Sequence, residues 1–115
     1  MTVQPYIPGI EGLHSKVERT IAKRLIRTIL EAGYDVRIHE GEDWAMDKRS
    51  NDPKTIFDNM ASTDEDRVYF YSTSERKEQL GWIWLIYGNG EDLISDYSDN
   101  ELTNDLVAKA EKWDS

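Results

Sequence analysis

The chain has 115 residues, of which 38% are hydrophobic, 32% charged and 10% aromatic. This length and composition fit one compact domain with a modest core, and they exclude a large catalytic scaffold and disorder along the whole chain. The 14 Lys and Arg residues against 23 Asp and Glu give a net charge of -9. Such a charge disfavours attraction of the whole surface to DNA, RNA or anionic lipid, so we expect no direct nucleic-acid binding.

The chain contains no cysteine, which excludes disulfides, cysteine-bound zinc, iron–sulfur ligation and thiol catalysis. No apolar stretch approaches the roughly 18 residues of a membrane span, and the first residues lack the features of a signal peptide. We therefore expect a cytoplasmic protein without membrane association. His14 and His39 do not lie in a recognisable ligand pattern, so we expect no metal ion and no cofactor.

The first part of the chain predicts an arm followed by a helix. Prolines and glycines alternate with apolar residues over 1–13, which predicts an extended arm, and we expect residues 14–115 to form a single α+β domain. Apolar residues recur every four positions between Ser15 and Gly33. This spacing predicts an amphipathic helix whose outer side is basic.

Alternating apolar and polar residues over 34–40 predict a half-buried strand, with which a short strand over 44–47 would pair. Asp52 followed by Pro53 predicts the start of a short second helix. The next predicted strands form a meander and cover residues 67–73, 80–88 and 91–97. Asn89-Gly90 predicts a two-residue hairpin between the last two strands.

Ser98 and Glu101 have the spacing of a capping box, which predicts a C-terminal helix containing Leu106 and Trp113. The expected fold is therefore α+β, with an antiparallel sheet of four to five strands. We expect N-terminal and C-terminal helices and one short helix to pack on this sheet.

The hairpin register predicts two different sheet faces. A two-residue turn would place Trp82 opposite Tyr97. A loop over 74–79 would place Phe70 opposite Ile83 and Val68 opposite Leu85 in the preceding hairpin. One face would then be aliphatic and buried beneath the first helix, with Val68, Phe70, Ile83, Leu85 and Ile94. The other face would gather Tyr69, Tyr71, Trp82, Trp84 and Tyr97. Such an aromatic face is either a binding surface or is covered by the arm, the last helix or both, with Tyr6, Ile7 and Trp113 packing on the tryptophans.

Charge is distributed unevenly along the chain. Residues 91–115 contain eight acidic and two basic residues, a local net charge of -6. One interpretation is that this acidic surface imitates the phosphates of a nucleic acid and blocks a basic groove on another protein. The alternative is that it only keeps the protein soluble. The basic side of the first helix is likewise either solvated or a contact for an acidic partner.

One stretch of the chain carries a family resemblance. It consists of Gly81-Trp82, Tyr87-Gly88-Asn89-Gly90 and Asp92-Leu-Ile-Ser95-Asp96-Tyr97, preceded by Ser62-Thr-Asp64-Glu65-Asp66. Residues 56–97 thereby resemble a family of small acidic uncharacterised proteins encoded by bacteriophages and prophages. The resemblance implies origin in a mobile element and a place in the cytoplasm of a host bacterium, and it implies no particular activity.

Our leading hypothesis is a non-enzymatic phage-type accessory protein that binds a host protein with a basic surface. A further hypothesis is that it inhibits a nucleic-acid-handling or defence complex. The candidate contact residues are Asp92, Asp96, Asp99, Glu101, Asp105, Tyr69, Tyr71 and Tyr97. One alternative is a structural module that forms a homodimer through the aromatic sheet face. Another is a small enzyme, although no residue is singled out as catalytic.

Overall fold

The computed structural model describes residues 9–73 and 78–111, which form one four-stranded antiparallel sheet and three α-helices. The elements in chain order are η1 (Ile10–Gly12), α1 (Lys16–Glu31), β1 (Asp35–His39), α2 (Pro53–Asp58), β2 (Glu65–Tyr71), β3 (Gln79–Ile86), η2 (Gly90–Asp92), β4 (Ile94–Tyr97) and α3 (Glu101–Ala110). The expected α+β class, with an antiparallel sheet and helices packed on it, is confirmed.

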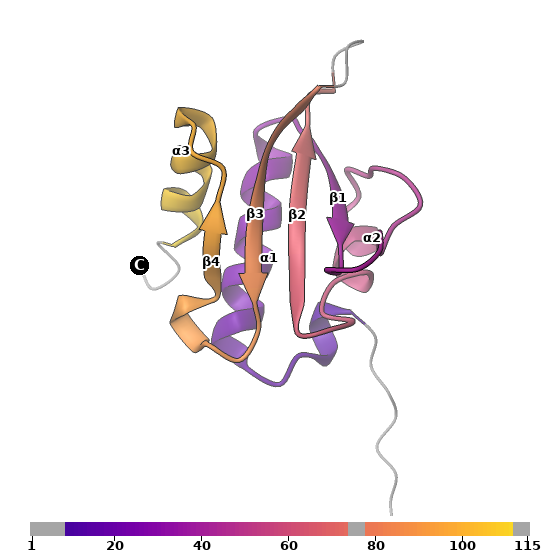
Figure 1. Cartoon of the computed structure of the whole chain (residues 1–115), viewed down its shortest axis with the longest axis vertical. Helices are drawn as coiled ribbons and strands as arrows, with labels where there is room; N and C mark the ends of the chain where they lie inside the picture. The colour runs from indigo at the N-terminus through magenta and orange to yellow at the C-terminus, as the bar shows by residue number, and fades with distance from the viewer. Residues whose placement is uncertain (1–8, 74–77, 112–115) are drawn as a thin grey trace, which may run out of the picture.

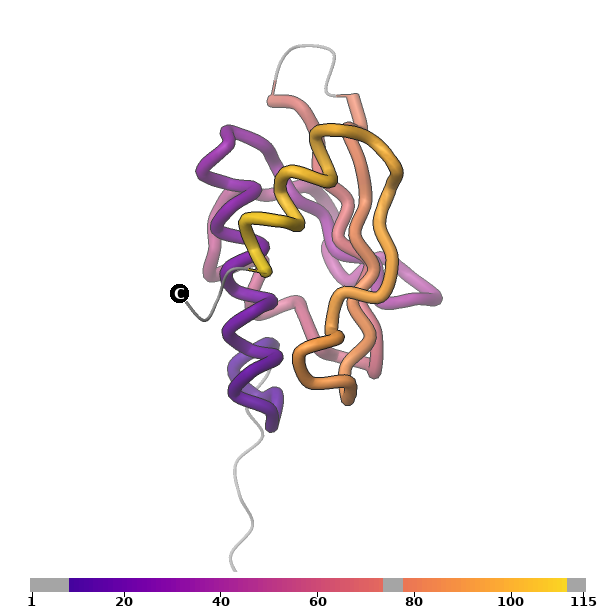
Figure 2. The backbone as a smooth tube through the Cα atoms, turned by 90° about the vertical axis from the view of Figure 1, so that its left-hand side faces the viewer, coloured from indigo at the N-terminus to yellow at the C-terminus, as the bar shows by residue number. Residues whose placement is uncertain are grey.

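The described helices all lie on one side of the sheet. The strand order is β1-β2-β3-β4, and α1 passes behind the strands in Figure 1. The view turned by 90° shows α1 and α3 together on one side of the sheet (Figure 2). The apolar stripe of α1 is buried there, including Ile21, Leu25 and Ile29. Because α3 contacts α1 and β3 from this side, the alternative that the last helix covers the aromatic face is wrong. The residues of the arm and the C-terminus that were expected to pack on the tryptophans, Tyr6, Ile7 and Trp113, lie outside the described residues.

Local signals set the starts of α1 and α2 as expected. The Ser15 side chain accepts a hydrogen bond from the backbone N–H of Glu18, and α2 begins at Pro53 with Asp52 as its cap. α3 differs from the predicted capping box, because Asn100 Oδ1 accepts from the N–H of Thr103 at 2.8 Å. Ser98 Oγ instead accepts from the N–H of Trp82 on β3 and is therefore committed to the sheet.

The pairing of β2 with β3 differs from the predicted register by two residues. Val68 lies opposite Ile83, and Phe70 lies opposite Gly81 rather than opposite Ile83. Side chains alternate between the two faces with a period of two, so this shift leaves every residue on its predicted face. The aliphatic residues of both strands are accordingly buried beneath α1.

The short strand expected over 44–47 does not form. Two isolated bridges tie this segment to β1 instead, pairing His39 with Trp44 and Val36 with Ser50. The N–H of Ala45 donates to the carbonyl of Ile38 at 2.9 Å. Residues 40–50 therefore form a loop fastened to the edge of β1, and the sheet has four strands.

The predicted two-residue turn at Asn89-Gly90 is wrong, because Asn89 has a φ of -108° and η2 follows it. A type I′ turn requires positive φ at both central residues. The carboxylate of Glu18, which is 2% exposed, explains the difference. Glu18 Oε2 accepts hydrogen bonds from the backbone N–H groups of Gly88, Asn89 and Gly90 at 2.8, 2.9 and 2.9 Å. A side chain some 70 residues earlier in the chain thus sets the shape of the connection.

β4 contains a bulge that moves one predicted site residue. Asp96 lies opposite Trp84 and Ile94 opposite Leu85, which leaves Ser95 as the extra residue. Tyr97 consequently lies opposite Ile83 and packs against the core. The expectation that Tyr97 belongs to the aromatic face is therefore wrong, and Asp96 lies on that face.

Candidate functional site

The sheet surface that points away from the helices carries four of the eight Tyr and Trp residues that the structure describes. We call it the aromatic face, and it comprises Arg37, His39, Arg67, Tyr69, Tyr71, Trp82, Trp84 and Asp96. No described helix covers it (Figure 2). Its four Tyr and Trp side chains are half-buried.

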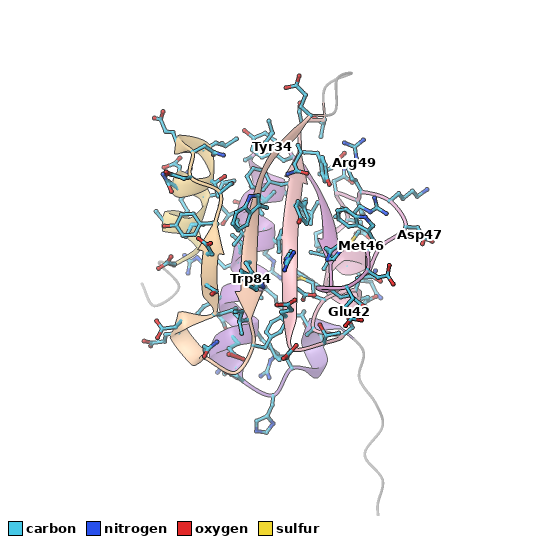
Figure 3. All side chains as sticks on the ribbon, in the orientation of Figure 1. Tyr34, Glu42, Met46, Asp47, Arg49 and Trp84 are labelled. Carbon is cyan, nitrogen blue, oxygen red and sulfur yellow. The ribbon has the colours of Figure 1, made fainter. Side chains whose placement is uncertain are left out.

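Three arginines lie over aromatic rings on this side of the sheet. The Cζ atom of Arg37 is 4.1 Å from the centre of the Trp44 ring, that of Arg49 is 4.8 Å from Tyr71, and that of Arg67 is 5.0 Å from Trp84. Figure 3 shows Trp84 on β3 and Arg49 beyond the edge of β1, so the pairs extend across several strands. A guanidinium held over a ring is oriented before any ligand arrives.

Trp44 extends the aromatic face beyond β1. Its ring is 5.2 Å from that of Tyr69 and 5.0 Å from that of His39, and the residue is 40% exposed. Trp44 is the most exposed large apolar side chain among the described residues. The loop fastened to β1 thus adds an accessible indole to the sheet surface.

A cavity of about 270 Å³ lies between β2, β3 and β4 on the aromatic face. Its lining residues are Arg67, Tyr69, Trp82, Trp84 and Asp96. Trp84 Nε1 donates to Glu65 Oε2 at 2.9 Å, which fixes the indole beside the cavity. Arg67 Nε is buried and has no hydrogen-bond partner among the described residues. The cavity therefore combines aromatic walls with an arginine that forms no hydrogen bond or ion pair with the described residues.

The structure separates the predicted contact residues into four places. Tyr69, Tyr71 and Asp96 lie on the aromatic face, whereas Tyr97 lies on the helical side. Asp92 belongs to η2. The remaining acids, Asp99, Glu101 and Asp105, line a groove of about 990 Å³ at the start of α3, together with Asn100, Leu102, Asn104 and Ala108. The acidic and aromatic surfaces thus meet only at Asp96.

The basic side of α1 lies on the opposite side of the sheet from the aromatic face. Lys23, Arg24 and Arg27 line a second groove of about 720 Å³ with Lys109 of α3 and the side chains of Thr20, Thr28 and Glu31. Lys23 also pairs with Glu11. The position of these basic residues confirms that the outer side of the first helix is basic, as expected.

Sequence reasoning missed the arginines and Trp44 as members of the site. Arg67 is two positions from Tyr69, so the period of two could have placed it on the same face. Arg37 alternates in the same way along β1. No local signal places Trp44 over Tyr69, because that contact depends on how a loop folds back on the sheet.

Asp66 is a buried carboxyl on the helical side of β2, with no exposed area. Its Oδ2 accepts hydrogen bonds from the N–H of Ala61 at 2.7 Å and from the Tyr87 hydroxyl, while Oδ1 has no partner among the described residues. Burial raises the pKa of Asp66 to about 7, because these hydrogen bonds offset only part of the desolvation of the charged form. The enclosed carboxyl cannot contact a ligand in the folded chain, and its hydrogen bonds tie Ala61 and Tyr87 to β2.

Asp66 is expected to make stability decline as the pH rises. The folded state retains the proton up to a pH of about 7, whereas the unfolded state loses it near 3.8. The folded state therefore binds more protons between these values, and the free energy of unfolding falls across the window by as much as about 4 kcal/mol from this group. Asp66→Asn keeps an acceptor for both hydrogen bonds and should remove this decline.

Urea unfolding of the wild type and Asp66→Asn at pH 5 and pH 8 measures the effect. Relative to the wild type, Asp66→Asn should therefore gain stability on going from pH 5 to pH 8. The exposed neighbour Asp64 provides the control, because Asp64→Asn should retain the wild-type pH dependence. Equal pH dependence in the wild type and Asp66→Asn would contradict the assignment.

Among the described residues, no group of three or more His, Cys, Asp or Glu side chains is placed to hold a metal ion. Within residues 9–73 and 78–111, no helix has the length and apolar content needed to cross a membrane. Comparisons with protein-family models, curated proteins and solved structures found no match. Any inference about function therefore depends on the geometry of the surfaces described above.

Proposed function

We propose that this chain is a non-enzymatic protein-binding module and that the aromatic face is its contact surface. The observation that carries the proposal is the set of three arginines held over aromatic rings on a sheet face that no described helix covers. Trp, Tyr and Arg dominate the energetically important centres of protein interfaces, since each buries a large area and also forms polar contacts.

The charges on this side of the sheet favour a protein over a nucleic acid as the ligand. Platforms that bind single strands combine aromatic rings with a positively charged groove along the phosphates. Here three acids accompany the three arginines, namely Asp35, Glu65 and Asp96. The side chains therefore provide no excess positive charge that would attract phosphates.

The resemblance to phage-encoded proteins makes a host protein in the bacterial cytoplasm the partner that we propose first. The acidic groove at the start of α3 would provide a second contact for a basic region of that partner. Inhibition of a nucleic-acid-handling or defence complex is a further step of the same proposal. The alternative of a homodimer uses the same aromatic face, so one experiment addresses both.

A photo-reactive benzoylphenylalanine placed at Tyr71 should cross-link to one defined protein when the chain is expressed in bacteria. The same group at Glu31, on the helical side, should not cross-link to it. Trp82→Ala should abolish the cross-link, because it removes a ring from the centre of the face. The matched control is Leu30→Ala, which truncates a half-buried apolar residue of α1.

Circular dichroism must first establish that both variants are folded. A cross-link to a second copy, together with a dimer in light scattering that is lost in Trp82→Ala, would favour the homodimer. An undiminished cross-link in folded Trp82→Ala would contradict the use of the aromatic face altogether.

A further inference from the structure

We propose that the cavity between β2, β3 and β4 is a carboxylate-binding site, which receives an Asp or Glu side chain of the partner protein. This inference rests on the proposed function and specifies the chemistry of the contact. It assigns Arg67 as the residue that binds the carboxylate. It also reverses the expected role of Asp96, which was predicted to attract a basic partner.

Arg67 has donors that the protein itself does not satisfy. Its guanidinium forms no hydrogen bond or ion pair with the described residues, and its Nε is buried. The guanidinium Cζ lies 5.0 Å from the centre of the Trp84 ring. Nε is enclosed and out of reach of a ligand, whereas the terminal Nη groups are not enclosed and have no acceptor among the described residues. An acceptor that reaches the Nη groups from the cavity is therefore favoured.

The shape of a guanidinium selects a planar, two-oxygen acceptor. The two Nη groups each present an N–H at the outer end of the guanidinium, and this pair matches the two oxygens of a carboxylate. The cavity of about 270 Å³ has room for one side chain. Tyr69, Trp82 and Trp84 line it and would exclude water around the ion pair, which strengthens the attraction.

Asp96 shares the cavity with Arg67 but does not neutralise it. No ion pair joins the two side chains, and Asp96 is exposed, with its Oδ1 accepting from the N–H of Tyr97 at 2.9 Å. Asp96 is therefore solvated, and the Arg67 guanidinium has no ion-pair partner in the cavity. An anion can pair with that guanidinium, and Asp96 weakens its binding by repulsion.

The alternative occupant is a cationic side chain held by the aromatic rings and Asp96. Aromatic cages bind cations through the faces of their rings. Arg67 opposes this use, because its positive charge is inside the same cavity and already lies over Trp84. The two occupants predict opposite effects of removing the charge of Asp96.

The experiment uses the full chain and three single amino acids whose backbone ends are blocked and carry no charge, at constant ionic strength. They are the amides of N-acetyl-glutamate, N-acetyl-glutamine and N-acetyl-lysine. The readout is the indole N–H resonance of Trp84, assigned with Trp84→Phe. We expect saturable shifts with the glutamate probe and much weaker binding of the glutamine and lysine probes.

Arg67→Gln should weaken binding of the glutamate probe about tenfold or more, and Arg67→Lys should restore only part of it, since an ammonium lacks the two-donor edge. Asp96→Asn should tighten binding about threefold by removing a nearby like charge. The matched control is Arg24→Gln on α1, which changes the net charge equally but lies in the groove on the opposite side of the sheet.

The site is refuted by any of three results: no saturable shift with the glutamate probe, equal weakening in Arg24→Gln and Arg67→Gln, or weaker binding in Asp96→Asn. Preferential binding of the lysine probe would indicate a cation cage. Loss of the Tyr71 cross-link in Trp82→Ala without any carboxylate binding would leave the proposed function standing and overturn only this inference. Carboxylate binding without a cross-link would leave this inference standing and overturn the proposed function.

Discussion

Replacing Glu18 by alanine is expected to lower the free energy of unfolding by about 4 kcal/mol. The Glu18 carboxylate is 2% exposed and accepts from the N–H groups of three successive residues, Gly88, Asn89 and Gly90. Successive N–H groups in such a loop form a concave site for an anion, which the protein fills with its own side chain. Alanine would leave these donors without acceptors and create a cavity beneath the loop.

Chemical denaturation measures the loss, and hydrogen exchange locates it, because the amides of 88–90 should lose protection first. Glu18→Gln retains one oxygen acceptor and should be intermediate. Glu31→Ala is the control within the same helix, since Glu31 is exposed and its removal should change stability by less than about 0.5 kcal/mol. A loss of that small size in Glu18→Ala would show that the carboxylate does not hold the loop.

The second large effect is expected at Gly81, where β3 passes closest to the start of α3. A Cβ atom there would lie 2.4 Å from Thr103 Oγ1 and 2.7 Å from both Phe70 Cζ and Ser98 Oγ. Phe70 and Thr103 are fully buried, and the two hydroxyls are 2.8 Å apart in a hydrogen bond. Gly81→Ala should therefore cost about 3 kcal/mol, because the neighbours must move apart.

Thermal or urea unfolding of Gly81→Ala should be compared with that of Gly33→Ala. Gly33 has a φ of +90°, and no atom lies within 4 Å of the position of its missing Cβ. That substitution tests backbone strain without a clash and should cost about 1 kcal/mol. A smaller loss at Gly81 than at Gly33 would mean that α3 does not pack against β3 as closely as described.

The separation of the acidic and aromatic surfaces restricts how a partner can bind. Tyr71 is the last residue of β2, whereas Glu101 and Asp105 lie on a helix packed on the other side of the sheet. One partner that touched both surfaces would have to extend around the β4 edge, past Asp96. Charge reversal at Glu101 and Asp105 would therefore leave a contact confined to the aromatic face intact.

Local sequence determined the helices, the strand meander and the two faces of the sheet. Periods of four and two residues report which side of an element is apolar, and a cap such as Asp52 acts within three residues of its partner. The two-residue difference in the β2–β3 register did not disturb this result, because pleating returns each side chain to the same face.

Tertiary structure alone decided the β3–β4 connection, the bulge that turns Tyr97 into the core, and the docking of Trp44 on Tyr69. Each depends on a contact between distant parts of the chain, of which the bonds from Glu18 to the loop are the clearest case. Periodicity carries no information about such contacts, since they depend on which groups meet after the layers have packed. The arrangement of arginines over aromatic rings belongs to this second class, and so does the cavity in which Arg67 is left without an acceptor.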